Sequence, residues 1–330
     1  MSFPARLASV CAAIVLLVAV WILGIVFSPQ RVAQRSAGAP LVSLPASAQI
    51  RSVDIFARAT DPAPIVTLKK NGPREWDVSA GSLSFPASAD RVAALLQGLR
   101  DMRRGNLVTR DPIKLDSLGL DNERAHRVVL HREGAPDTSL LVGKRAASGD
   151  EEYVKASGDP SAWLTRSSVG ILLAQDRPYW YDLRVLPEDI QGGTIFSIAV
   201  AGSVRLGAPE EKVLGGSYTL SRRTAQSSEW VIQGQKTSVS PLAAATMADR
   251  LAQLEGMDFA QSAVGDTAPD AGLLQVTIVA INGDRYILRV TGGAEPGKIL
   301  LTTSWSPWTY VMDPATLART VLPLQSLLAP

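Results

Sequence analysis

The chain has one cysteine, Cys11, and only two histidines, His126 and His131, among its 330 residues. A single cysteine excludes a disulfide within the chain and a thiolate metal cluster. The two histidines are five positions apart in a stretch that we expect to be a strand, so their side chains should point to opposite faces. We therefore expect no metal site and interpret both histidines as surface or edge residues.

The glycine-rich motifs that cradle phosphates are also missing, because the chain has no G-x-x-x-x-G-K-[ST] and no G-x-G-x-x-G. There is no G-x-S-x-G nucleophile turn either. We expect a protein without a cofactor that is not an enzyme and does not hydrolyse ATP. A carboxylate-dependent envelope hydrolase using Glu151 and Glu152 stays open as an alternative, although their polar surroundings favour a solvated loop.

The charges are few and balanced, with 33 Lys and Arg against 31 Asp and Glu, a net charge of +2. A nucleic-acid-binding protein usually carries a clustered basic face, so no nucleic acid partner is expected. Hydrophobic residues make up 46% of the chain, which favours a folded protein over a disordered one. The length allows two domains, each large enough for its own core.

One long apolar run is present, from Leu7 to Phe27, and it contains no charged residue. About 20 apolar residues in a helix span a bilayer core. Residues 1–27 therefore predict a single transmembrane anchor that contacts membrane lipid. A cleaved signal peptide and a lipoprotein signal are the alternatives. The run is longer than a usual signal core, Pro40 follows the best small-residue cleavage site, and most of the run follows Cys11.

Arg6 lies on one side of this run, and Arg31 and Arg35 lie on the other, so positive charge does not set the orientation. We expect the plan common to single-anchor proteins, a short cytoplasmic N-terminus in the bacterial inner membrane and a periplasmic folded portion. Residues 28–49, rich in Pro, Ala and Ser, predict a linker that lifts this portion off the membrane.

The rest of the chain reads as two repeated units, residues 50–187 and 188–330. In the first, strands on either side of Asn71-Gly72 predict a hairpin that ends near Trp76. Ser88 predicts the cap of a helix whose apolar stripe runs from Val92 to Met102. Further strands are expected at 127–131, 139–142, 153–156 and 162–164.

The second unit repeats this order. Its opening strand is expected at 194–200, and its hairpin is expected at 218–221 and 230–233. Ser240-Pro241 predicts the start of a helix with an apolar stripe from Met247 to Met257. Strands on either side of Asn282-Gly283 predict a second hairpin, and two later strands and a short helix from Pro314 close the unit. The predicted fold class is α+β: a transmembrane helix followed by two repeated units, each an antiparallel sheet with one main covering helix.

The runs Leu118-Gly119-Leu120-Asp121, 127–130 (RVVL), 140–143 (LLVG) and 153–155 (YVK) carry a family resemblance, together with the hairpin that ends at Trp76. The first unit resembles an uncharacterised domain-of-unknown-function family, and the second resembles it more loosely. The family has an aromatic residue where this chain has Leu118, and no recognisable Gly-Leu motif occurs in the second unit unless 271–273 is its remnant.

Members of that family have one membrane helix and tandem copies of the domain, and many are encoded beside ABC transporters of the gliding-motility type. The resemblance therefore implies an ABC transporter permease or auxiliary subunit as the partner. It implies no catalytic residues.

Two aromatic clusters are candidate interaction surfaces, because Trp and Tyr dominate binding hot spots. Tyr179, Trp180 and Tyr181 lie at the junction of the two units, and Trp305 lies near the C-terminus. We expect a membrane-anchored, non-enzymatic accessory protein of the cell envelope, associated with an ABC transporter complex. The alternative is an envelope glycan- or lipid-binding module that uses the aromatic junction.

Overall fold

The computed structural model describes residues 17–18, 38–42, 50–72, 75–206, 212–260, 272–292 and 298–329. The chain divides into two compact units, Met1–Trp180 and Tyr181–Pro330. Residues 181–187, which the sequence assigned to the first unit, belong to the second. The backbone N–H of Val185 donates a hydrogen bond to the carbonyl oxygen of Leu254, 2.9 Å away.

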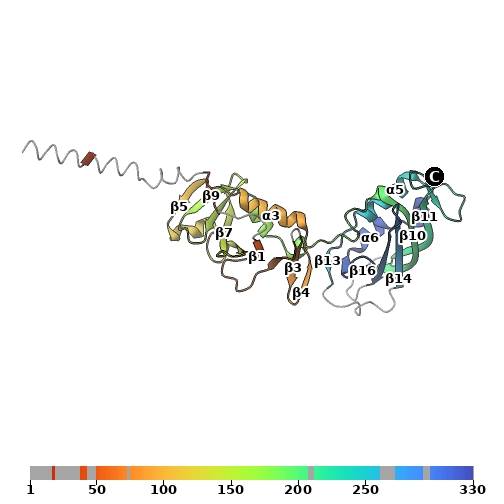
Figure 1. Ribbon diagram of the computed structural model, residues 1–330, viewed down its shortest axis with the longest axis horizontal. Helices are drawn as coiled ribbons and strands as arrows, with labels where there is room; N and C mark the ends of the chain where they lie inside the picture. Colours follow the sequence, from red (N-terminus) through yellow and green to blue (C-terminus); the bar gives the residue numbers. More distant parts are fainter. Residues whose placement is uncertain are drawn as a thin grey trace, which may run out of the picture. The chain divides into compact units, whose positions relative to one another are not determined.

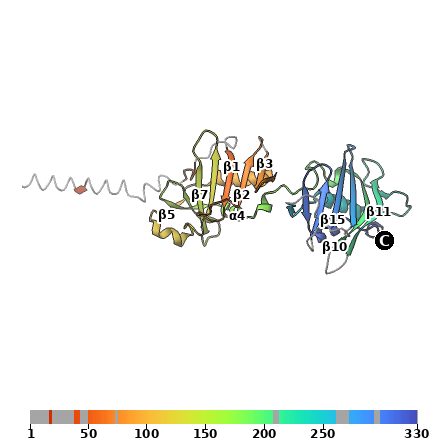
Figure 2. The same cartoon turned by 90° about the horizontal axis from the view of Figure 1, so that it is seen from below.

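The first unit is built on a nine-stranded antiparallel sheet in the order β4-β3-β2-β1-β6-β7-β8-β9-β5. Figure 2 shows β1, β2 and β3 side by side in this sheet. The strands are β1 (Ile50–Phe56), β2 (Val66–Lys70), β3 (Trp76–Ala80), β4 (Leu83–Pro86), β5 (Asn106–Thr109), β6 (His126–Arg132), β7 (Thr138–Arg145), β8 (Glu151–Ala156) and β9 (Ala162–Arg166). The α-helices are α3 (Ala89–Asp101) and α4 (Val169–Leu173), and the 3₁₀-helices are η2 (Pro112–Leu118) and η3 (Arg177–Trp180).

The second unit is built on an eight-stranded antiparallel sheet in the order β12-β11-β10-β14-β15-β16-β17-β13. The strands are β10 (Ile195–Leu206), β11 (Lys212–Arg222), β12 (Trp230–Ile232), β13 (Asp258–Phe259), β14 (Gly272–Ala280), β15 (Arg285–Gly292), β16 (Ile299–Thr303) and β17 (Thr309–Met312). The helices are η4 (Gly192–Thr194), α5 (Pro241–Ala252), α6 (Pro314–Thr320) and α7 (Leu324–Leu327).

The two sheets have the same strand order once β4 is set aside, because β1, β2 and β3 correspond to β10, β11 and β12, and β6–β9 correspond to β14–β17. In both units the main helix follows the hairpin and precedes the strand at the far edge of the sheet, β5 or β13. A register shift occurs at the same point of both opening strands, between Ile50 and Ser52 and between Ile195 and Ser197. The architecture is therefore α+β with two antiparallel sheets of matching topology.

The two main helices form where the sequence predicts them. The Ser88 hydroxyl accepts a hydrogen bond from the backbone N–H of Arg91, and the Ser240 hydroxyl accepts one from Ala243, so both serines are N-caps. The predicted apolar stripe of α3 is buried, and Figure 1 shows this helix against the first sheet. In α5 the stripe ends earlier than predicted, because Met257 lies beyond the helix and is 59% exposed.

Part of the predicted linker is docked on the first unit. The backbone N–H groups of Gly38 and Leu41 donate to the carbonyl oxygens of Arg104 and Met102, at 2.8 and 3.0 Å. The side chains of Leu41 and Val42 are buried. Residues 38–42, here called the strap, belong to the predicted linker 28–49 and are held at the C-terminal end of α3.

Among the described residues, none of the helices has the length and apolar character needed to cross a membrane. The predicted anchor lies outside the described residues except for Leu17 and Val18, which are helical.

Candidate functional site

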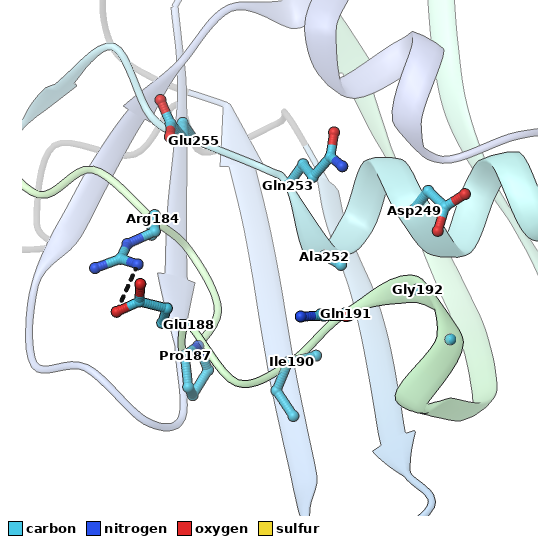
Figure 3. Close-up of a pocket in the computed structure, with 11 residues that line it drawn as sticks. Arg184, Pro187, Glu188, Ile190, Gln191, Gly192, Asp249, Ala252, Gln253 and Glu255 are labelled. Atoms are coloured by element: carbon cyan, nitrogen blue, oxygen red, sulfur yellow. Dashed lines mark ion pairs between the residues drawn. The ribbon is translucent and has the colours of Figure 1, made fainter.

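A cavity of ≈ 380 Å³ opens on the second unit between two segments that are distant in sequence. One wall is the segment that leads from residue 184 to η4, and the other is the C-terminal end of α5 with the residues after it, as Figure 3 shows. The lining residues are Arg184, Pro187, Glu188, Ile190, Gln191, Gly192, Gly193, Asp249, Ala252, Gln253 and Glu255. The walls are tied by the β-bridge between Arg184 and Glu255.

Arg184 is the one cation of the cavity lining, and its guanidinium is held by two carboxylates. Its Nε and Nη2 donate to the two oxygens of Asp182 at 2.9 and 2.8 Å, and its Nη1 lies 3.1 Å from Glu188 (Figure 3). These contacts, the Asp182 hydrogen bond first, raise the pKa of Arg184 above its ordinary value against the opposing effect of burial. The Arg184 guanidinium is therefore held in place, and its positive charge is balanced by Asp182 and Glu188.

The opposite wall carries three polar side chains. The side chains of Asp249, Gln253 and Glu255 are exposed, and they make no hydrogen bond with the described residues. Asp249 lies directly against Gly192, since a Cβ at that glycine would stand 1.9 Å from its Oδ1. The lining carries three carboxylates and one guanidinium, so it suits a small hydrophilic molecule with hydroxyl or ammonium donors.

Within the described ranges, no group of three or more His, Cys, Asp or Glu side chains could hold a metal ion.

The aromatic junction proposed as an interaction surface is largely internal. Trp180 is fully buried in the first unit, where its carbonyl oxygen accepts a hydrogen bond from the backbone N–H of Ser88 at 2.8 Å. Tyr181 is 2% exposed in the second unit, and its ring centroid lies 5.2 Å from that of Phe259. These two rings belong to cores and are not available at a surface, which corrects the expectation for both.

Tyr179 and Trp305 remain partly accessible. Tyr179 is half-buried, and the Arg91 guanidinium lies 4.8 Å from its ring centroid. Trp305 is 45% exposed, while its indole Nε1 donates to the carbonyl oxygen of Val185 at 2.6 Å. Trp305 is thus fixed at one edge and open at the other, and its partner Val185 directly follows Arg184, where the cavity wall begins.

Glu152, one of the two carboxylates considered for hydrolysis, is fully buried on β8. Its two oxygens accept hydrogen bonds from the backbone N–H of Gly170 at 3.2 and 3.1 Å, at the start of α4. Burial raises the pKa of Glu152, against the opposing effects of the Gly170 bond and of Arg145 at 3.9 Å. A group enclosed in this way cannot meet a substrate from solution, so its role is structural.

His131 joins a polar network that the sequence did not indicate. Its Nε2 lies 2.9 Å from Asp54, its Nδ1 lies 2.9 Å from Asp137, and Asp54 also accepts from the Thr67 hydroxyl at 2.7 Å. Burial lowers the pKa of His131, but the hydrogen bonds and charges of the two aspartates outweigh it and raise that pKa above its ordinary value. An imidazolium fits best here, because both ring nitrogens then donate.

The cavity residues were missed from the sequence for a plain reason. Polar residues at 184–193 and 249–255 look like ordinary solvated loop and helix-end positions. Only the pairing of residue 184 with residue 255 brings them together.

The comparisons with known proteins give one result. No curated protein and no solved structure matches the chain. A family model described as a domain of unknown function (DUF4340) matches residues 76–275, more than half of the chain, and extends from β3 of the first unit to β14 of the second. The chain therefore belongs to the DUF4340 family.

Proposed function

We propose that this chain is a membrane-anchored, non-enzymatic accessory protein of the bacterial cell envelope. Its apolar segment Leu7–Phe27 would anchor it in the inner membrane, with the folded units in the periplasm. Its two units, a tandem repeat in this proposal, would bind a permease or auxiliary subunit of an ABC transporter. The apolar segment and the matching strand orders support the plan, and the family resemblance supports the partner.

One observation carries the partner-binding role. The strands β10 and β11 have 12 and 11 residues, whereas their counterparts β1 and β2 have 7 and 5. The additional length forms an arm, defined as residues 202–206, 212–216 and 272–274, in which β10 pairs with both β11 and β14.

The arm carries apolar side chains on both faces, and its exposed face also carries Ser203 and Arg205. Val204, Leu214 and Leu274 are buried on one face, while Val213 and Leu273 on the other are 59% and 48% exposed. In the register, Ser203 pairs with Leu273, and Arg205 pairs with Val213, so the two exposed side chains lie on one face. Among the described residues the first unit has no such arm, and exposed apolar side chains on a sheet are suited to docking a protein.

The test places a photocrosslinking amino acid at position 213 of the full chain in intact cells. Leu242, on α5 and 78% exposed, is the matched control position. We expect adducts with transporter subunits at position 213 and none at 242. Equal adducts at both positions, or no adduct with any membrane transporter, would reject the proposal.

A second candidate, a module that binds an envelope glycan, is supported by the cavity. Its unused polar groups Asp249, Gln253 and Glu255 suit a sugar better than a lipid chain. Calorimetric titration of the full chain with soluble cell-wall fragments tests this function. Heat that disappears in Glu255→Gln would favour it, and no heat with any fragment would reject it.

A further inference from the structure

The edge strand β5 of the first unit is bordered by side chains of unusual exposure and charge. Ile113, in the first turn of η2, is 86% exposed, the largest exposure of any large hydrophobic side chain among the described residues. Val108 on β5 is 40% exposed. We define the β5 edge surface as Arg103, Val108, Arg110, Ile113 and Lys114, the exposed apolar and basic residues that lie just before, on and just after this strand.

The acidic groups beside this surface already have partners. The Asp111 carboxylate caps η2 by accepting from the backbone N–H of Ile113 at 3.0 Å. Asp116 is ion-paired with Arg124, and Asp101 accepts from the Gln97 amide at 2.9 Å.

The three cations keep their charge for an outside partner. Among the described residues, the Arg103 side chain donates to two backbone carbonyl oxygens, and the Arg110 Nε donates to the Ser161 hydroxyl at 3.3 Å. Lys114 makes no ion pair with the described residues. Three exposed cations around an exposed isoleucine match the chemistry of an anionic lipid surface, in which the cations meet phosphates and the apolar side chain enters the interface.

The strap links the N-terminal part of the chain to the first unit beside this surface. It is bonded to residues 102–104, directly before β5, so the chain reaches the first unit at this edge. Only residues 28–37, ten in number, separate Phe27 from Gly38. Ten residues span at most about 35 Å even when fully extended. If the apolar segment is the anchor, the edge that contains β5 is held within about 35 Å of the end of that segment.

We propose that the β5 edge surface contacts the bilayer and binds the headgroups of anionic phospholipids, with Ile113 entering the interfacial layer. This proposal rests on the membrane anchor of the proposed function. The contact would hold the first unit on the membrane in one orientation, with β5 toward the lipid and the opposite edge of its sheet, at β4, directed away.

The experiment uses the full chain reconstituted into vesicles, with Cys11→Ser as the background. An environment-sensitive fluorophore is attached through Ile113→Cys, and a second preparation carries it through Leu242→Cys as the matched exposed control. The vesicles are phosphatidylcholine alone or phosphatidylcholine with phosphatidylglycerol, and a lipid-borne quencher reports contact.

We expect the label at 113 to be blue-shifted and quenched several-fold more than the label at 242, with anionic vesicles only. Replacing Arg103, Arg110 and Lys114 together by Gln should abolish the difference between the two labels. Each charge removed should weaken the membrane contact of the label at 113 roughly fivefold. If the chain floats with the vesicles but the label at 113 behaves like the label at 242, the surface proposal fails and the anchor stands. If quenching is equal with both lipids, recognition of anionic headgroups is wrong. If the chain floats with neither type of vesicle, both the membrane anchor and the proposed lipid contact are rejected.

Discussion

The network of His131 with Asp54 and Asp137 makes a quantitative prediction for the first unit. Replacing His131 by Gln keeps a neutral donor but removes the imidazolium that both carboxylates contact. The pKa of His131 is raised in the folded state, so its contribution is fully present below the unfolded value of about 6.5 and is lost as the pH rises through the folded pKa.

The magnitude follows from exposure. The side chains of His131, Asp54 and Asp137 are 33%, 21% and 55% exposed, so solvent screens both contacts and the Asp137 contact most. Exposed ion pairs contribute about 0.2–1 kcal/mol each. We therefore expect His131→Gln to lower the free energy of unfolding of the first unit by about 1–1.5 kcal/mol near pH 5, and by much less near pH 9.

The assay is urea unfolding of the wild type and the variant from about pH 5 to about pH 9, followed by tryptophan fluorescence, with the transition of each unit fitted separately. His126 provides the contrast, because burial lowers its pKa and a His126→Gln variant should therefore gain relative stability toward acid pH. The reasoning would be refuted if His131→Gln lowered the free energy of unfolding equally across the pH range, or more at alkaline pH than at acid pH.

Three further predictions concern stability. Burial raises the pKa of Glu152, so the wild type should lose stability as the pH rises through that folded pKa. Glu152→Gln keeps an oxygen that accepts from the Gly170 N–H, so urea titrations of this variant should not show the loss. A variant that is less stable than the wild type at every pH would contradict the prediction. Trp180→Ala should destabilise the first unit by about 3–5 kcal/mol because the ring is fully buried, while a loss below about 1 kcal/mol would show that the site is not core. Ser88→Ala and Ser240→Ala should each cost about 1 kcal/mol, the first in the transition of the first unit and the second in that of the second, and a loss in the wrong transition would contradict the caps.

The sequence determined the features that depend on neighbours along the chain. Asn282-Gly283 predicted the hairpin of β14 and β15, and Gly283 has φ +94°, a backbone conformation that glycine adopts without strain. Ser88 and Ser240 predicted the starts of α3 and α5, because a cap is a contact between residues three apart. The α+β class and the resemblance to a domain-of-unknown-function family followed from such local patterns, and the DUF4340 match over residues 76–275 confirms that a domain of unknown function is present.

Some short edge strands were not predicted. β5 has four residues and β13 has two, and neither shows a buried-and-exposed alternation that a pattern search could detect. They become strands because β9 and β17, more than 50 residues further along the chain, provide hydrogen-bonding partners. Distant pairing of this kind is not encoded by local propensity, which is weak and context-dependent for strands.

The tertiary structure alone decided which polar and aromatic residues are accessible. Trp180 and Tyr181 read as a surface cluster in the sequence but are buried, each in a different unit. The strap reads as linker but is bonded to residues 102–104. The cavity exists because residues 184 and 255 pair across the second unit. Burial and pockets depend on contacts between segments far apart in the chain, whereas caps, turns and stripes depend on residues within a few positions of each other.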